Sequence, residues 1–226
     1  MKIVLAYSGG VDSAYLKHRL EAEGHEVLPV TVALPDLSIP EVAMNRRDRC
    51  YWCKRAMFAK LRDYADSVGA DFVADGTNAD DLKEYRPGLR ARDEMGVRSP
   101  LAEAGLTKAD VRRLAEAAGL AVAVKPSSPC MATRFPYDTE LTREKLALAA
   151  HAEALVREYL PPSANMRVRC VGGRAAIETD PGCFAQLRQA WPELENRLCL
   201  LGFVGVEPEV APFRSGRWDG TGDFQA

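Results

Sequence analysis

The first 24 residues constrain the fold of this chain most strongly. Residues 2–7, KIVLAY, are a short apolar run that predicts a strand. The segment Ser8-Gly9-Gly10-Val11-Asp12-Ser13 follows directly, and a helical stretch then runs to Gly24, a residue type that often ends helices. A strand, a glycine turn and a helix in this order predict an α/β protein with a parallel sheet.

Further strands and helices are predicted to alternate along the chain. The predicted strands cover residues 26–34, 71–75 and 121–125, and the predicted helices include 45–68, 140–159 and one opened by a capping box of Thr107 and Asp110. This alternation predicts a doubly wound parallel sheet, which binds ligands at the carboxyl ends of its strands. We therefore expect SGGVDS, GTNADD and SSPCMATR, each placed after a predicted strand, to meet at one edge.

A domain boundary is predicted at Pro161-Pro162, which stops the long helix. Residues 1–160 then form the parallel-sheet domain, and residues 161–226 form a small C-terminal α+β domain. Within the second domain, MRVRC and AAIET flank Val171-Gly172-Gly173-Arg174 and predict a hairpin.

Charge and hydropathy limit the functions that the chain can have. Thirty Lys and Arg residues against 32 Asp and Glu leave a net charge of −2, which argues against binding nucleic acid through bulk charge. No apolar run approaches the roughly 20 residues of a membrane helix, and the N-terminus turns polar too early for a secretory signal. We expect a cytoplasmic protein whose six cysteines are thiols or metal ligands rather than disulfides.

The glycine turn has the composition of an anion-binding loop. Gly9 and Gly10 allow the backbone to fold tightly and to direct several N–H groups at one anion, while the following helix adds its positive end. Ser8 and Ser13 can donate hydroxyl hydrogen bonds. A glycine turn without a ligand is the alternative on these residues alone.

The string SGGxDS resembles the pyrophosphate-binding motif of the PP-loop ATPases, which have an adenine nucleotide α-hydrolase-like fold. It differs from the pattern GxxxxGK[ST] because no lysine follows. The resemblance implies that ATP is cut between its α- and β-phosphates to adenylate a substrate. It also implies that Ser8, Gly9, Gly10, Asp12 and Ser13 bind the nucleotide, with Asp12 helping to hold Mg²⁺.

Three cysteines are candidates for chemistry. Cys50 and Cys53 are spaced i and i+3 on a predicted helix, so their sulfurs face the same way, and the surrounding basic residues favour thiolates. Cys130 follows the predicted strand at 121–125, and doubly wound geometry can bring it beside the pair. Redox motifs and partial zinc sites share the CxxC spacing, but no fourth thiolate or nearby histidine completes a zinc tetrahedron. Cys170 and Cys199 are predicted to be core residues, and Cys183 is unassigned.

The order of motifs along the chain resembles the LarE family of ATP-dependent sulfur transferases. The matching segments are SGGVDS, RCYWCK, DGTNADDLKEYRPGLRA, GVRSPL, KPSSPCMATRFPY and FRSG, and Asp138 stands where the family has glycine. The resemblance implies action on a pyridinium-3,5-biscarboxylic acid mononucleotide for synthesis of a nickel-pincer cofactor. ATP and Mg²⁺ would adenylate a carboxylate, and sulfur would displace AMP to give a thiocarboxylate.

The source of the sulfur depends on the cysteines. Some members of the family lose the sulfur of a single sacrificial cysteine, at the position of Cys130, and keep dehydroalanine. Members with two further cysteines resemble thiolases that hold a 4Fe–4S cluster through three cysteines. Because Cys50 and Cys53 are both present, the cluster is the preferred reading, with sacrificial Cys130 as the alternative.

The resemblance also suggests residues that bind the substrate. Arg167 and Arg214 match positions that bind the substrate phosphate, although either could be a solvated surface arginine. Trp52 could stack on the pyridinium ring or pack in the core. Glu178 matches an acidic residue near the metal or subunit interface. Asp80 and Asp81 could contact nucleotide or Mg²⁺, or cap a helix.

Two other functions are compatible with the first motif. A PP-loop thiolase acting on tRNA is one, although such enzymes often carry basic or zinc-binding modules that this sequence lacks. A non-catalytic module that binds adenine nucleotide is the other. The resemblance further implies a homo-oligomer, either a trimer or a hexamer, and gives the C-terminal domain a role in substrate binding or oligomerisation.

Overall fold

The computed structural model describes residues 1–33, 35–84, 86–207, 210–213 and 217–219, and the chain divides into two compact units. The first unit contains Met1–Val42 and Asp48–Lys125, and the second contains Ala43–Arg47 and Pro126–Ala226. The division falls at 125/126 rather than at the predicted 160/161. The reason is that helix α7 (Arg143–Arg157) packs on the second unit, where Glu153 accepts a 3.1 Å hydrogen bond from the backbone N–H of Val168.

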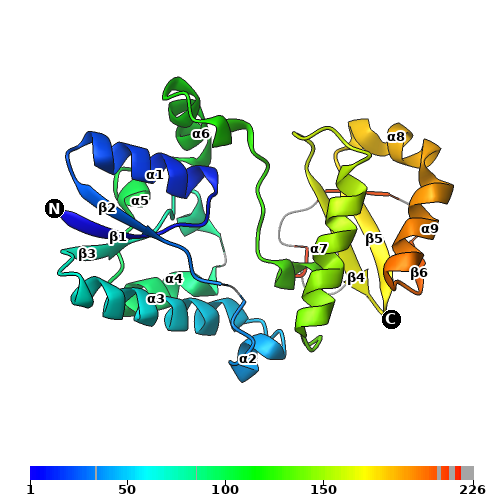
Figure 1. Ribbon diagram of the computed structural model, residues 1–226, viewed down its shortest axis with the longest axis horizontal. Coiled ribbons are helices and arrows are strands. Elements are labelled where there is room, and N and C mark those ends of the chain that lie inside the picture. The colour runs from blue at the N-terminus through cyan, green and yellow to red at the C-terminus, as the bar shows by residue number, and fades with distance from the viewer. Residues whose placement is uncertain (34, 85, 208–209, 214–216, 220–226) are drawn as a thin grey trace. The chain divides into compact units, whose positions relative to one another are not determined.

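The first unit is built on a parallel sheet, as predicted. Strand β1 (Lys2–Ala6) lies between β2 (Glu26–Val30) and β3 (Phe72–Ala74). Ile3 and Leu5 face one core cluster and Val4 faces the other, because successive side chains of a strand point to opposite faces. Helices therefore cover both faces of the sheet (Figure 1).

The helices of the first unit follow the predicted pattern with shorter bounds. One face is covered by α1 (Val11–Ala22), α5 (Pro100–Glu103) and α6 (Lys108–Ala117), and the other by α3 (Arg49–Ser67) and α4 (Pro87–Glu94). The predicted capping box is confirmed: Thr107 Oγ1 accepts from Asp110 N, and the Asp110 carboxylate accepts from Thr107 N. Two short helices complete the connections, at α2 (Pro40–Ala43) and η1 (Asp81–Lys83).

The predicted strand at 121–125 is wrong. Residues Ala121–Val124 form a 3₁₀ turn, η2, in which only Ala123 is buried and Val124 is 72% exposed. Arg112 donates hydrogen bonds to the carbonyls of Ala123 and Lys125, so these acceptors are satisfied without a strand partner. A short apolar run does not by itself distinguish a strand from a buried turn. Next to β3, Arg98 makes a single parallel bridge with Ala74 instead.

The second unit contains the predicted hairpin. Strands β4 (Met166–Val171) and β5 (Arg174–Thr179) pair antiparallel, and Gly172 and Gly173 have positive φ values of 55° and 79° that a tight hairpin turn requires. Two short strands, β6 (Gly205–Val206) and β7 (Ala211–Pro212), pair parallel with β5. The remaining elements are η3 (Met131–Arg134), η4 (Pro181–Cys183), α8 (Phe184–Gln189) and α9 (Trp191–Leu201).

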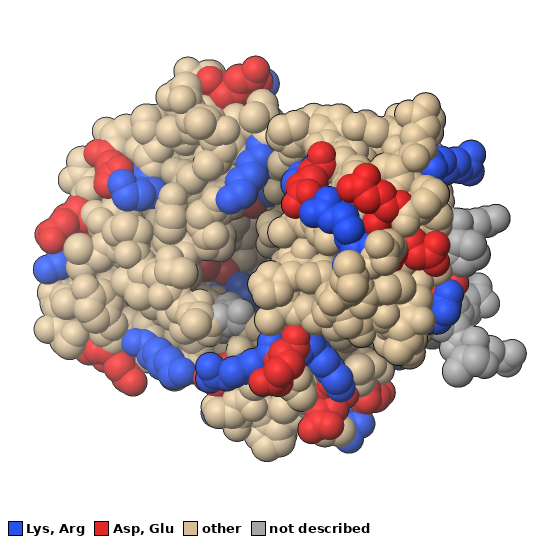
Figure 2. All heavy atoms as spheres, turned by 45° about the vertical axis from the view of Figure 1, so that its right-hand side comes forward, with Lys and Arg blue, Asp and Glu red and all other residues tan. Residues whose placement is uncertain are grey.

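The surface mixes charges of both signs. Figure 2 shows basic and acidic side chains interspersed over the face that it draws. Each helix in the described part of the chain is too short or too polar to span a lipid bilayer.

Candidate functional site

The loop between β1 and α1 is folded by its own serines and glycines. Gly9 has a positive φ of 69°, a conformation that glycine adopts without strain. The hydroxyls of Ser8 and Ser13 lie 3.2 Å apart, and Ser13 Oγ donates to the carbonyl of Gly10 at 3.1 Å. Gly10 is the N-cap of α1, so the positive end of the helix begins at this turn. The arrangement is that of an anion-binding loop.

A second loop, Asp75–Asp81, leaves the neighbouring strand β3 at the same edge of the sheet. Gly76 allows the two loops to touch, because a Cβ at this position would lie 3.1 Å from Ser13 N and 3.3 Å from Asp12 Cβ. Asn78 Nδ2 donates to Asp12 Oδ1 at 3.4 Å. The predicted meeting of SGGVDS and GTNADD is therefore confirmed, at the carboxyl ends of adjacent parallel strands.

A buried carboxylate holds the second loop in place. Asp75 accepts hydrogen bonds from Thr77 N at 3.1 Å, from Thr77 Oγ1 at 2.7 Å and from Ser99 Oγ at 2.7 Å. Its backbone N–H also bonds the carbonyl of Arg98. These contacts join GTNADD to GVRSPL and fix the loop that faces Asp12.

Two lysines reach the glycine loop, and sequence reasoning missed both. Lys108 Nζ forms an ion pair with Asp12 Oδ2, and Lys125 Nζ lies 3.4 Å from the carbonyl oxygen of Gly9. Lys108 is the first residue of α6, so the capping box at Thr107 is the signal that could have pointed to it. In a GxxxxGK[ST] loop the positive charge is a lysine of the loop itself. Here Lys108 and Lys125, which are distant in the sequence, supply it.

Acidic residues near Asp12 complete the polar edge. The backbone N–H of Lys108 donates to Asp80 at 2.9 Å and lowers the pKa of that carboxyl. Burial raises the pKa of Asp81, whose carboxylate accepts from Asn78 N at 3.1 Å. Mg²⁺ prefers oxygen ligands and is commonly bound by one or two carboxylates plus substrate phosphates. Asp12, with Asp81 nearby, fits that requirement.

The three candidate cysteines lie in different units. Cys50 and Cys53 are in the first two turns of α3, where Cys50 is exposed and Cys53 is buried. Cys130 belongs to the second unit, is exposed and is the N-cap of η3. Within either unit as described, no three His, Cys, Asp or Glu side chains lie close enough to hold a metal ion.

The other cysteines divide between core and surface. Cys170 is buried as predicted, and burial raises its pKa to about 12, so it stays a thiol. The prediction that Cys199 is a core residue is wrong, because Leu194 and Leu198 form the buried face of α9 and Cys199 lies outside it. Cys183 is buried.

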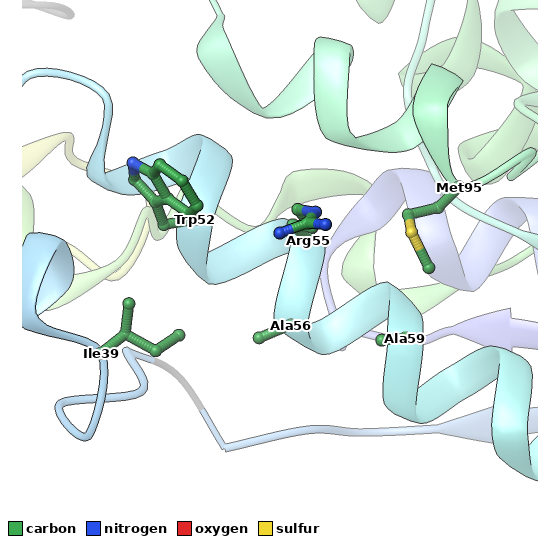
Figure 3. A pocket seen from close by; sticks show the side chains of 6 residues that line it. All are labelled: Ile39, Trp52, Arg55, Ala56, Ala59 and Met95. Atoms are coloured by element: carbon green, nitrogen blue, oxygen red, sulfur yellow. The ribbon is translucent and has the colours of Figure 1, made fainter.

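Trp52 lies on a different side of α3 from Cys50. At 3.6 residues per turn it is about 200° around the helix from Cys50 and about 100° from Cys53. Its indole N–H donates to Asp48 at 2.9 Å, and its ring lines an open hollow of about 400 Å³ (Figure 3). The hollow is also lined by Ile39, Arg55, Ala56, Ala59 and Met95. Trp52 is partly buried and packs against the core cluster that contains Val4, as the core alternative predicted.

Arg167 is buried in the second unit, so the surface alternative is wrong for this residue. It donates to the carbonyls of Met166 at 2.6 Å and Ser127 at 2.7 Å, and its guanidinium lies 5.0 Å from the ring of Phe213. Burial, followed by the nearby charge of Arg134, lowers its pKa to about 10. Arg214 lies outside the described residues.

Among the residues that the structure describes, the arginines around Arg167 outnumber the glutamates that form ion pairs with them. Arg134 forms an ion pair with Glu153 at 2.6 Å, and Glu178 is held between Arg169 at 2.9 Å and Arg217 at 2.7 Å. Together with Arg167, four arginines meet two glutamates. Such an excess of positive charge favours a bound anion.

Comparison with known proteins shows which proteins the chain is similar to. No family model matches it. It is 32% identical to a pyridinium-3,5-bisthiocarboxylic acid mononucleotide synthase of Lactiplantibacillus plantarum, over 97% of this chain and 90% of that protein. An uncharacterised protein of Synechocystis is also 32% identical, over 96% of this chain and 91% of its own length. A tRNA-specific 2-thiouridylase of Corynebacterium kroppenstedtii is 29% identical over 57% of this chain and 51% of its own.

The parallel sheet and its glycine loop are compatible with the PP-loop ATPase class, to which the distant likeness to the thiouridylase also points. Within that class, similarity over almost the full length is decisive. The chain belongs to the LarE family, the sulfurtransferases that include pyridinium-3,5-bisthiocarboxylic acid mononucleotide synthase.

Proposed function

We propose that this protein is an ATP-dependent sulfurtransferase that converts the carboxylates of pyridinium-3,5-biscarboxylic acid mononucleotide to thiocarboxylates, for synthesis of a nickel-pincer cofactor. The observation that carries the proposal is its near full-length similarity to the synthase, together with the contact between the SGGVDS and GTNADD loops. The tRNA thiolase is the alternative, and its relatives match 57–64% of this chain and 51–54% of their own length.

The first step of the proposed reaction is activation of a carboxylate. A carboxylate oxygen of the substrate attacks the α-phosphorus of ATP, the bond to the β-phosphate oxygen breaks, and pyrophosphate leaves. The Gly9–Gly10 turn, Ser8 and Ser13 bind the phosphates, and Asp12 holds Mg²⁺ when the ion is present. Lys108 and Lys125 lie close enough to the loop to neutralise the charge of the departing pyrophosphate.

The second step is displacement of AMP by sulfur. The sulfur attacks the activated carbonyl carbon, the bond to the AMP oxygen breaks, and a thiocarboxylate results. The proposed ligands of a 4Fe–4S cluster are Cys50, Cys53 and Cys130, and their fit rests on the thiolate chemistry of the three side chains and on the exposure of Cys50 and Cys130. A cluster bound by only three cysteines supplies an open iron position that can carry a transferable sulfide.

A sacrificial cysteine is the alternative sulfur donor. Cys130 Sγ would attack the activated carbonyl, AMP would leave, and the resulting thioester would lose its Cβ–Sγ bond by elimination. The products are the thiocarboxylate and a dehydroalanine at position 130. The exposure of Cys130 supports this route as well as the cluster.

Substrate binding is proposed to use the second unit. The excess of arginines around Arg167 suits the phosphate of a mononucleotide, and Arg214 is proposed to join them. Trp52 remains a candidate for stacking on the pyridinium ring. A trimer or hexamer is the proposed assembly.

The test uses protein purified without oxygen and incubated with ATP, Mg²⁺ and the biscarboxylic mononucleotide. The expected products are pyrophosphate and a mononucleotide in which sulfur has replaced oxygen, measured by mass spectrometry. Asp12→Asn should slow pyrophosphate release about 100-fold. A parallel incubation also contains tRNA, and thiolated tRNA with unchanged mononucleotide would establish the alternative function. ATP binding without pyrophosphate release in both incubations would indicate a binding module.

The sulfur donor is distinguished in the same preparation. The cluster predicts about four irons and matching sulfide per chain, lost in Cys53→Ala. The sacrificial route predicts a colourless protein whose mass falls by one H₂S per turnover at Cys130, with Cys53→Ala still active.

A further inference from the structure

The start of α3, whose first two turns carry Cys50 and Cys53, has weak support of its own. Its N-cap, Asp48, makes no side-chain capping bond, because the Asp48 carboxylate accepts instead from the indole N–H of Trp52. The N–H of Tyr51 donates to the carbonyl of Asp48 at 2.8 Å, but the other first N–H groups of a helix depend on capping side chains. Contacts with a neighbouring element therefore add to the fixed placement of the two thiols.

Helix α4 is that neighbour, and Gly88 lets it approach closely (Figure 1). A Cβ on Gly88 would lie 3.2 Å from Lys54 Cγ and 3.6 Å from the carbonyl oxygen of Cys50. Gly88 is buried at the start of α4, one residue after Pro87. The sequence PGLRA contributes no residue to the candidate nucleotide site. Its glycine instead allows α4 to pack directly against the start of α3.

Tyr51, the residue after Cys50, contacts Arg90 and Glu94 of α4. It is buried, and its hydroxyl donates to Glu94 Oε2 at 2.7 Å. The guanidinium of Arg90 covers its ring at 3.6 Å, and Arg90 Nε lies 3.4 Å from Glu94 Oε1. Arg90 and Glu94 are one turn apart on α4, so the two side chains hold the ring and its hydroxyl together.

The geometry points to Tyr51, Arg90 and Glu94 as positioning residues for the cysteine pair. Because Tyr51 lies between Cys50 and Cys53, fixing its ring fixes the rotation of the turn about the helix axis. That rotation leaves Cys50 exposed and Cys53 buried. The role in sulfur transfer rests on the function proposed above, whereas the placement of the thiols does not.

Thiol alkylation tests the placement directly. Iodoacetamide labelling of the full-length protein, with each cysteine peptide quantified by mass spectrometry, reports how often Cys53 becomes accessible. Glu94→Leu removes the acceptor of the Tyr51 hydroxyl, and we expect Cys53 to react about tenfold faster. Tyr51→Phe should act in the same direction. Glu94→Gln retains an acceptor oxygen and should restore a rate within about twofold of the original.

Asp93→Leu is the matched control. Asp93 is exposed on α4 and pairs with Arg92 rather than with Tyr51, so its replacement should leave Cys53 labelling unchanged. Circular dichroism establishes that each variant is folded. A folded Glu94→Leu protein with unchanged Cys53 labelling would overturn the inference, and so would equal acceleration by Glu94→Leu, Glu94→Gln and Asp93→Leu.

A second readout separates this inference from the proposed function. If anaerobically prepared protein holds a cluster, Glu94→Leu should alter the electron paramagnetic resonance spectrum of the reduced cluster, and Glu94→Gln should restore it. A protein without iron whose Cys53 labelling still responds to Glu94→Leu would refute the cluster and leave the positioning role intact.

Discussion

Gly76 occupies the point where the two loops of the candidate nucleotide site come closest. The atom nearest to a Cβ added at Gly76 is the backbone nitrogen of Ser13, at the start of α1. A backbone atom cannot move away by changing rotamer, as a side-chain atom could. Gly76→Ala should therefore push the loops apart and weaken binding of a non-hydrolysable ATP analogue about tenfold, measured by calorimetry. Gly182→Ala is the control, because no atom lies within 4 Å of its added Cβ. Equal affinities for the two variants would contradict the assignment of the loop contact.

Lys108 is the cation that meets Asp12, although the two residues are 96 positions apart in the sequence. Without it, the carboxylates of Asp12 and Asp81 would repel the triphosphate, so Lys108→Ala should raise the KM for ATP about tenfold or more. Lys108→Arg, which keeps the charge, should recover part of the loss. Lys83→Ala is a matched control, because Lys83 is 74% exposed and pairs with Asp80. The KM for ATP is measured from steady-state pyrophosphate release. An unchanged KM in Lys108→Ala would show that Lys108 does not contribute to binding ATP.

At the scale of elements, the start of α6 determines where Lys108 lies. Thr107 caps the helix one residue earlier, and its hydroxyl accepts from Asp110 N at 3.2 Å. Thr107→Ala should lower the free energy of unfolding by about 1 kcal/mol, measured by urea denaturation. Thr107→Ser, which keeps the hydroxyl, should lose much less.

The same cap gives a pH dependence with a definite sign. Hydrogen bonds from the Thr107 side chain and then from its backbone N–H lower the pKa of Asp110 below 3.8. A carboxyl whose folded pKa is lowered adds stability above its unfolded pKa and loses that contribution as the pH falls through the folded pKa. The difference in melting temperature between wild type and Asp110→Asn should therefore be largest near pH 7 and shrink below about pH 3.8. A difference that grows with acid would refute this account.

In the second unit, a buried ion pair between Arg134 and Glu153 connects η3, which follows Cys130, to helix α7. Arg134, at the end of η3, is fully buried and donates to both carboxylate oxygens of Glu153 in α7, at 2.6 and 2.8 Å. Arg134→Met leaves a largely buried carboxylate unpaired and should cost about 3–5 kcal/mol in urea denaturation. The double variant Arg134→Met/Glu153→Met should recover part of that loss, because it removes the unpaired charge. A double variant less stable than Arg134→Met would show that the pair is not the source of the cost.

For the whole molecule, local signals predicted local structure and missed what distant segments build together. The strand, glycine loop and first helix, the hairpin around Gly172 and the capping box at Thr107 all depend on residues close in sequence, and all were predicted. The prediction of a strand at 121–125 failed because an apolar run of four residues also fits a 3₁₀ turn that buries a single side chain, Ala123. Helix α7 was assigned to the wrong side of the division because Pro161-Pro162 signals the end of a helix, not the sheet against which it packs.

The candidate site shows the same limit. The proximity of Asp12 and Asn78 could be predicted from the sequence, because the carboxyl ends of parallel strands meet at one edge of the sheet. Lys108 and Lys125 could not, because their approach depends on the packing of α6 and η2 against α1, which no local pattern encodes. The burial of Arg167 was missed for a related reason, since its partners come from residues 127, 166 and 213.

The proposed cluster makes a prediction that only the whole molecule can test. A group bound by Cys50, Cys53 and Cys130 would join segments 77 residues apart in the sequence and would therefore stabilise the folded chain against unfolding. A ligand present at about 100 times its Kd adds about 2.7 kcal/mol, which should raise the melting temperature of the reconstituted protein by roughly 5 °C or more. Replacing any one of the three cysteines by serine should remove the rise, whereas Cys199→Ser, at an exposed cysteine of α9, should retain it. If Cys130→Ser still takes up iron and keeps the rise, Cys130 is not a cluster ligand, and the sacrificial route becomes the better account of its exposed thiol.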